Sequence, residues 1–337
     1  MTAGVYLESY LAPLADWLSR GDVTDLLINR PGEVWIETTE GRTVCEPAPA
    51  LTETALSRLA RQIAAASHQG VNREQPLLSA TLPDGARVQI VGPPATRGGL
   101  VMAVRKHVIS DLSVDDLMAS GLFAEPSPHA LSASARDAQL WALLDGGQIA
   151  EFLKAAVRWR KTIVISGGTS SGKTTLLNAL VKEIDREERL VVIEDAAEVR
   201  LDHPNAVGLI AVRGQLGEAR VDADDLVAAA LRLRPDRILL GELRGREAFA
   251  FLRAVNSGHP GSLTTVHADN PSAALDQIAL LALTSGLDLD FSKIQTYVGQ
   301  VVDVVVQLER VAGRRRVGEI QFRAPRPPGT AAPDAVV

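Results

Sequence analysis

A nine-residue run near the middle of the chain constrains its fold more than any other feature. From Gly167 to Thr175 the chain reads Gly-Gly-Thr-Ser-Ser-Gly-Lys-Thr-Thr, which fits the phosphate-binding loop G-x-x-x-x-G-K-[ST]. A β-branched run, 161–166, precedes the loop, and a segment with helical periodicity, 176–181, follows it. A Gly-rich turn can match the pattern by chance, but these flanking elements argue against that. The loop therefore predicts a nucleotide-binding α/β fold.

The residue types in the loop indicate how a nucleotide is held. Glycines let the backbone bend around a polyphosphate, while successive N–H groups and the positive end of the helix dipole face its oxygens. Lys173 is expected to reach the β- and γ-phosphates, and the Thr174 hydroxyl to hold magnesium. We therefore expect ATP with Mg²⁺ to contact the whole loop, that is, Gly167, Gly168, Thr169, Ser170, Ser171, Gly172, Lys173, Thr174 and Thr175.

Composition limits the setting in which this loop works. A chain of 337 residues suits two domains, and a formal net charge of −6 gives no indication of nucleic-acid binding through overall charge. The single cysteine, Cys45, can form neither an internal disulfide nor a cysteine-based zinc site, which favours a reducing compartment. No Lys or Arg precedes Arg20 and no apolar run approaches 18 residues, so we expect neither a signal peptide nor a membrane span. These features predict a cytoplasmic protein that can still dock on a membrane complex.

Residues 1–120 are expected to form a smaller α+β N-terminal domain, because strands and helices mix there without βαβ order. Asp84-Gly85 between two alternating runs is a strong hairpin signal. The segment 121–147, which contains Pro126 and Pro128, is the expected interdomain linker. The patterns predict helices at 5–18 and 52–67, and strands at 25–29, 33–37, 77–82, 86–91 and 100–105.

Residues 148–323 alternate between strand and helix patterns, which predicts a doubly wound α/β RecA-like P-loop ATPase domain. The Pro- and Ala-rich tail, 324–337, is expected to be disordered. The expected strands are 162–166, 190–193, 207–212, 238–241, 263–266, 302–308 and 317–322, and the expected helices are 174–184, 222–233, 246–257 and 271–284.

Acidic residues end two of these strands. Glu194 and Asp195 follow the strand 190–193 at the carboxyl edge of the predicted sheet, where one or both would join the magnesium shell. The alternative is a solvated strand end or helix cap. Glu242 follows the strand 238–240 and Gly241, and it would accept a proton from the attacking water.

Two histidines flank the short strand 263–266. Metal binding is one reading, but no cysteine lies nearby and the spacing of His259 and His267 is not that of a zinc motif. We expect His267 to contact the γ-phosphate or the attacking water, with a structural histidine as the alternative.

Together these blocks resemble those of the secretion-superfamily ATPases, and most of all the VirB11 type, the hexameric traffic ATPases of type IV secretion systems. The resemblance covers roughly residues 20–323 and is carried by four blocks in the family's order, 167–174 (Walker A), 193–195 (Asp box), 231–245 (Walker B) and 258–268 (His box). It implies that Lys173 and Thr174 bind nucleotide and magnesium, Glu194 belongs to the Asp box, Glu242 is catalytic and His267 acts from the His box.

The resemblance also implies a contribution from the N-terminal domain. In the family, arginines in the hairpin and in an "IRK"-like strand approach the nucleotide phosphates, and Val104-Arg105-Lys106 resembles that strand. Arg87 and Arg105 are therefore expected to be catalytic, with a pair of solvated strand-end charges as the alternative. A homo-hexamer is expected to contact other type IV secretion components at the inner membrane, on its cytoplasmic side.

Other classes of protein share some of these features. Type II secretion ATPases usually carry a four-cysteine zinc module, which a chain with Cys45 as its single cysteine cannot form. Tight-adherence pilus assembly ATPases usually carry a longer N-terminal extension. A DNA-translocating motor would need phosphate contacts, for which the candidates are Arg232, Arg234 and Arg237 or the run 314–316. A nucleotide-gated scaffold without turnover is disfavoured by the complete set of catalytic blocks. The sequence thus favours an ATP-hydrolysing, ring-forming motor of a type IV secretion or conjugation apparatus.

Overall fold

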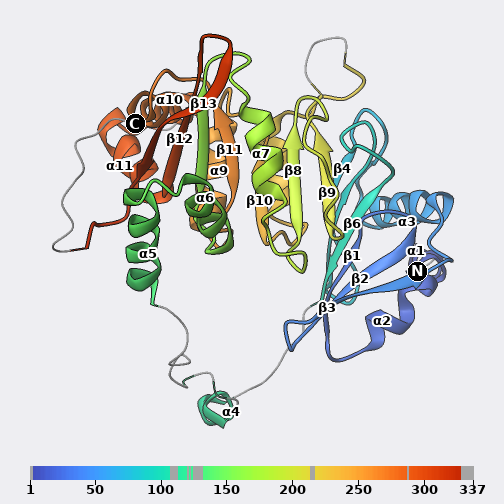
Figure 1. The fold of residues 1–337 in the computed structure, drawn as a ribbon. Coiled ribbons are helices and arrows are strands. Elements are labelled where there is room, and N and C mark those ends of the chain that lie inside the picture. Colours follow the sequence, from blue (N-terminus) through green and yellow to red (C-terminus); the bar gives the residue numbers. More distant parts are fainter. Residues whose placement is uncertain are drawn as a thin grey trace.

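The protein folds around two β-sheets (Figure 1). The computed structural model describes residues 3–106, 113–119, 121, 123, 132–212, 217–286 and 288–327. The N-terminal sheet has the strand order β3-β2-β1-β6-β5-β4, and the C-terminal sheet has the order β13-β12-β7-β11-β10-β8-β9. None of the helices within the described ranges is long and apolar enough to cross a membrane.

The N-terminal sheet is antiparallel throughout its six strands. Its core lies between the sheet and α3, whose first turn is capped by Thr52, the side chain of which accepts a hydrogen bond from Ala55 N at 3.2 Å. Its strands are β1 (Val23–Ile28), β2 (Gly32–Thr38), β3 (Thr43–Ala48), β4 (Leu77–Thr81), β5 (Arg87–Val91) and β6 (Val101–Arg105), and its helices are α1 (Ala3–Leu11), the 3₁₀ turn η1 (Ala12–Leu14), α2 (Ala15–Ser19) and α3 (Glu53–Ala66).

Six strands of the C-terminal sheet run parallel, and β13 pairs antiparallel with β12 at one edge. Separate apolar cores lie on its two faces, one against α8 to α11 and the other against α5 to α7, as the prediction of a doubly wound sheet requires. The strands are β7 (Ile163–Gly167), β8 (Leu190–Glu194), β9 (Ala206–Ile210), β10 (Arg237–Leu240), β11 (Leu263–Val266), β12 (Val304–Val311) and β13 (Arg314–Phe322), and the helices are α5 (Ala133–Asp145), α6 (Ile149–Arg158), α7 (Lys173–Val181), α8 (Ala223–Ala230), α9 (Glu247–Asn256), α10 (Pro271–Leu283) and α11 (Phe291–Val301).

Several elements differ from those expected from the sequence. The first helix is interrupted by η1, whose first turn contains Pro13. Proline lacks the N–H that a continuous helix needs, which accounts for the interruption. The helix α5 lies inside the range 121–147, in which a linker was expected, and α4 (Val114–Ala119) precedes it. The strand β3 and the helices α6 and α11 were not expected. Parts of the predicted linker and the predicted tail from 328 on lie outside the described residues.

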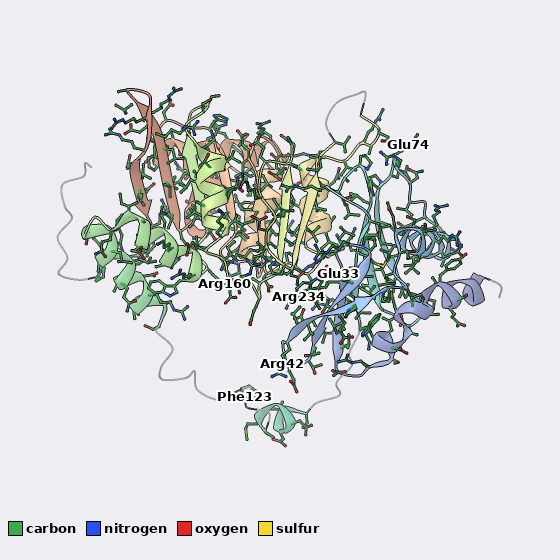
Figure 2. All side chains as sticks on the ribbon, turned by 45° about the vertical axis from the view of Figure 1, so that its right-hand side comes forward. Glu33, Arg42, Glu74, Phe123, Arg160 and Arg234 are labelled. Atoms are coloured by element: carbon green, nitrogen blue, oxygen red, sulfur yellow. The ribbon has the colours of Figure 1, made fainter. Side chains whose placement is uncertain are left out.

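The two sheets contact each other through the loop between β5 and β6. Arg97 N donates to Gly208 O at 3.0 Å and Ile210 N donates to Ala95 O at 3.0 Å, so this loop pairs with the outer edge of β9. An ion pair between Arg234 and Glu37 joins the two domains. Figure 2 shows Arg234 close to the place where the two domains meet. The contact therefore combines backbone pairing with charged side chains.

Candidate active site

The phosphate-binding loop joins β7 to α7, as the motif predicts. Gly172 caps α7 with a left-handed backbone, φ 101°, and Gly167 has φ 153°. A Cβ at Gly167 would lie 2.5 Å from Leu308 O and 2.6 Å from Ser171 Oγ, so glycine is required there. The loop borders a cavity of about 470 Å³ that also receives the ends of β8, β10 and β11. The carboxyl ends of neighbouring parallel strands meet at this edge, which brings the separate sequence motifs together.

Lys173 is folded back onto its own loop. Its Nζ donates to Gly167 O at 2.8 Å and to Gly168 O at 3.1 Å, and it lies 3.4 Å from Nδ1 of His267. Burial lowers the pKa of Lys173, and the neighbouring charge of Glu242 opposes that shift. An anionic phosphate at this place would replace neutral carbonyl partners with charged oxygens and favour the charged ammonium.

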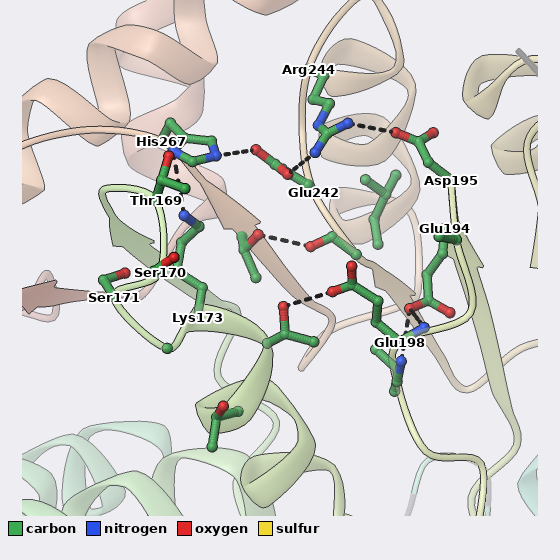
Figure 3. A pocket seen from close by; sticks show the side chains of 18 of the residues that line it. Thr169, Ser170, Ser171, Lys173, Glu194, Asp195, Glu198, Glu242, Arg244 and His267 are labelled. Carbon is green, nitrogen blue, oxygen red and sulfur yellow. Dashed lines mark hydrogen bonds and ion pairs between the residues drawn. The ribbon is translucent and has the colours of Figure 1, made fainter. Parts of the chain in front are cut away.

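Glu242 lies at the centre of a polar row across the cavity (Figure 3). Its Oε1 is 2.9 Å from His267 Nε2, and its Oε2 accepts a hydrogen bond from Arg244 NH2 at 2.6 Å. With Lys173 donating to Nδ1, these contacts fit a neutral imidazole of His267 that carries its proton on Nε2. Arg244 also contacts Asp195, with NH1 3.0 Å from Oδ2. The structure thus brings Lys173, His267, Glu242 and Asp195 into one connected arrangement.

Glu194 points away from this row. Its side chain is 3% exposed; Oε1 accepts hydrogen bonds from Glu198 N at 3.0 Å and Val199 N at 2.8 Å, while Oε2 pairs with Arg97. The carboxylate that reaches Thr174 is instead that of Glu198, whose Oε2 accepts from Thr174 Oγ1 at 3.0 Å. The direct role of Glu194 toward magnesium therefore stays a prediction, and these contacts favour a role in holding the loop.

The loop and its acidic neighbours fit a magnesium nucleotide. Within the described ranges no three His, Cys, Asp or Glu side chains form a metal cluster. Magnesium in nucleotide sites needs only one or two protein ligands beside phosphate oxygens and water, so the hydroxyl of Thr174 with nearby carboxylates suffices. The Oγ of Ser171 is buried without a hydrogen-bond partner, as expected for a polar atom that faces a phosphate.

Arg87 and Arg105 do not reach this cavity within the chain. They line a second cavity of about 510 Å³ between the two domains, together with Asp25, Arg232 and Arg234. Their catalytic role stays a prediction, and within one chain these two arginines line a different cavity from the phosphate-binding loop.

Most of the arginines considered for DNA binding have partners within the chain. Arg237 has a fully buried side chain and donates to both oxygens of Glu188, at 2.6 and 2.8 Å. Arg316 contacts Glu309, and Arg315 donates to Ser170 O at 3.2 Å on the rim of the phosphate-binding loop. Burial gives Arg237 a structural role, and Arg315 lines the cavity of the phosphate-binding loop. Both observations weaken the DNA-motor alternative.

His259 is held by a backbone contact and does not line the cavity of the phosphate-binding loop. Its Nδ1 lies 2.9 Å from Pro235 O, and burial lowers the pKa of its imidazole. The metal-binding alternative for the two histidines gains no support, since His267 alone lies at the cavity.

Sequence reasoning assigned no role in this site to four residues, Arg97, Glu198, Arg244 and Arg315, the last of which was considered only as a DNA contact. Arg244 lies two residues after Glu242, and its proximity to the catalytic candidate was the one available signal. Arg97 reaches the site from a loop of the N-terminal domain, and Arg315 reaches it from strand β13. Glu198 contacts Thr174, which lies 24 residues before it in the chain.

Comparisons with known proteins agree with this geometry. Residues 140–331 match the family model described as "Type II/IV secretion system protein". The type IV secretion system protein VirB11 of Bartonella henselae is 39% identical over 326 residues, covering 93% of this chain and 91% of the relative. The type IV secretion system protein PtlH of Bordetella pertussis is 41% identical over 325 residues, covering 94% and 95%. The crystal structure of the Brucella suis VirB11 ATPase in complex with sulphate superposes with a TM-score of 0.88 and 35% identity, covering 95% of each chain.

Proposed function

The chain belongs to the VirB11 family of type IV secretion ATPases, and we propose on this premise that it is a ring-forming motor that hydrolyses ATP. The observation that carries the proposal is the polar row from Lys173 through His267 to Glu242 in the cavity of the phosphate-binding loop. A row of this kind has a cation for the phosphates at one end and a carboxylate suited to a water proton at the other.

Each residue of the row has a task in this proposal. Lys173 and the loop N–H groups bind the β- and γ-phosphates and oppose the charge that develops on them. Bound Mg²⁺ supplies further charge neutralisation on the phosphate oxygens, and the Thr174 hydroxyl holds it. Glu242 accepts the proton of the attacking water, while His267 and Arg244 fix its two oxygens in place. Domain motion then transmits the energy of hydrolysis.

The motor is proposed to act as a homo-hexamer on the cytoplasmic face of the inner membrane, docked on other secretion components. Its output would be pilus assembly or the passage of DNA or protein. In such a ring, Arg87 and Arg105 would serve the phosphates of a neighbouring subunit, because within one chain they line a different cavity from the phosphate-binding loop. Loss of activity in an Arg87→Ala, Arg105→Ala double variant with an intact ring would support this assignment.

The experiment compares Lys173→Ala and Glu242→Gln in steady-state hydrolysis and in binding of a fluorescent ATP analogue. Lys173→Ala should lose both, because it removes the charge at the phosphates. Glu242→Gln should keep binding and lose about 10²-fold or more in turnover, the contribution typical of a general base. Lys154→Ala is the matched control, because that lysine pairs with Glu151 on the surface. Near-native hydrolysis by Glu242→Gln would refute the assignment, and native mass spectrometry tests the hexamer.

A further inference from the structure

Arg97 crosses from the N-terminal domain into the acidic edge of the active site. It lies in the loop between β5 and β6, and its side chain is 17% exposed. Its NH1 donates to Val199 O at 2.6 Å, and its NH2 pairs with Oε2 of Glu194. Burial lowers the pKa of Arg97, but a guanidinium stays charged at neutral pH. A buried carboxylate of the C-terminal domain is thus neutralised by a cation of the other domain.

The backbone around Arg97 is shaped to receive it. Its own N–H donates to Gly208 O in β9 at 3.0 Å, which fixes the start of the side chain. A Cβ at Gly208 would lie 2.4 Å from Cδ of Arg97 and 2.8 Å from its Nε. The path of the side chain therefore depends on glycine at position 208, an observation independent of the ion pair itself.

Hydrogen bonds connect Glu194 through Glu198 to Thr174, the residue expected to hold magnesium. Oε1 of Glu194 accepts hydrogen bonds from the backbone of Glu198 and Val199, which holds the loop that follows β8. Glu198 Oε2 accepts from Thr174 Oγ1 at 3.0 Å, and Glu198 O accepts from Asn178 Nδ2 at 3.2 Å. The loop is therefore held between α7 on one side and Arg97 on the other.

We propose that Arg97 is a positioning residue for the magnesium–nucleotide site: by neutralising Glu194 it holds the loop that presents Glu198 to Thr174. The inference rests on the proposed function in that it takes a magnesium nucleotide as the ligand. Arg97 is an N-terminal arginine that acts on this chain's own site, in contrast to Arg87 and Arg105. Undocking of the N-terminal domain would withdraw Arg97 and loosen the hold on magnesium.

The test separates metal binding from nucleotide binding in the full-length protein. The affinity for fluorescent mant-ADP is measured in EDTA, and Mg²⁺ is then titrated at a fixed mant-ADP concentration. Arg97→Gln should leave the affinity in EDTA unchanged and raise the half-saturating Mg²⁺ concentration about 10-fold, the loss typical of an outer-shell partner of a metal site. Gly208→Ala should shift the Mg²⁺ titration in the same direction because it displaces the arginine, and it carries the test if Arg97→Gln does not fold.

Arg73→Gln is the matched control. Arg73 also joins the two domains, through Glu218, but both side chains are exposed, at 62% and 47%, and neither lines the cavity of the phosphate-binding loop. Its Mg²⁺ titration should match that of the unaltered protein. An unchanged titration in Arg97→Gln, or an equal loss of affinity with and without Mg²⁺, would overturn the inference. Failure of the unaltered protein to hydrolyse ATP would refute the proposed function, while the Mg²⁺ titrations would still decide the inference.

Discussion

Replacing Glu188 by Gln should destabilise the C-terminal sheet. Glu188 precedes β8, its side chain is 14% exposed, and its two oxygens accept hydrogen bonds from Arg237 and Arg160. Arg237 opens β10, the strand that leads to Glu242, and it also donates to Val157 O at 2.7 Å. The substitution removes the negative charge and leaves the fully buried guanidinium of Arg237 without a counterion.

The magnitude follows from that burial. Removing one partner of a buried ion pair costs about 3–5 kcal/mol, because a buried charge is left uncompensated. The amide oxygen of glutamine still accepts one hydrogen bond, and Arg160, 41% exposed, can turn to water, so we expect the lower end, about 3 kcal/mol. For a domain of about 150–250 residues, 1 kcal/mol shifts Tm by about 2–4 °C, which gives a fall of about 6–12 °C.

Thermal unfolding followed by circular dichroism at neutral pH measures this fall. The control is Glu183→Gln, because Glu183 pairs with Arg158, which is 63% exposed. An exposed pair contributes about 1 kcal/mol or less, so the control should lower Tm by only a few degrees. Equal shifts in the two variants would show that Arg237 does not depend on its buried partner, and the reasoning would fail.

Three further outcomes follow from the geometry. Burial raises the pKa of Glu188, but hydrogen bonds from Arg237 and Arg160 lower it more, to below its ordinary 4.5. The lowered pKa of Glu188 stabilises the folded protein above pH 4.5, and this stabilisation is lost as the pH falls through the pKa that Glu188 has in the folded state. Glu188→Gln removes the titrating group, so the fall of Tm between neutral and acid pH should be smaller in the variant. Gly167→Ala should abolish nucleotide binding, measured with a fluorescent analogue, while circular dichroism shows the fold retained. His267→Ala should lower hydrolysis less than substitution of the glutamate it contacts; an unchanged rate with a lower Tm would indicate a purely structural histidine.

The phosphate-binding loop was predictable because its information is local. Its glycines, lysine and hydroxyl side chains are contiguous, and the positive φ at Gly172 is a conformation that glycine adopts more readily than other residues. The position of Glu242 at the cavity was predictable for a similar reason, since the short apolar strand β10 ends two residues before it. Arg97 was not predictable, because its importance arises where a loop of one domain meets a loop of the other, and no spacing in the chain encodes that approach. Glu198 was not predictable, because its contact with Thr174 depends on how the loop after β8 folds toward α7.

Secondary structure failed where tertiary context overrides local pattern. The strand β3 contains Pro47, which argues against a central strand, but β3 lies at the edge of its sheet, where one face of the backbone needs no partner. The helix α11 did carry a local signal, since Asp290 accepts a hydrogen bond from Lys293 N as an N-cap. No helix was expected there, because the patterns of the neighbouring α10 and β12 are more pronounced.

The pairing of residues 95–97 with β9 has a consequence for handling the protein in pieces. β9 is an edge strand of the C-terminal sheet, and Gly208 O and Ile210 N are satisfied there by the other domain. A fragment beginning after the N-terminal domain would leave both groups free on an apolar strand, and open strand edges recruit other chains. Fragment designs that aim for a soluble ATPase half therefore need a polar or proline substitution on the outer side of β9, or a short peptide spanning residues 92–100 supplied in trans.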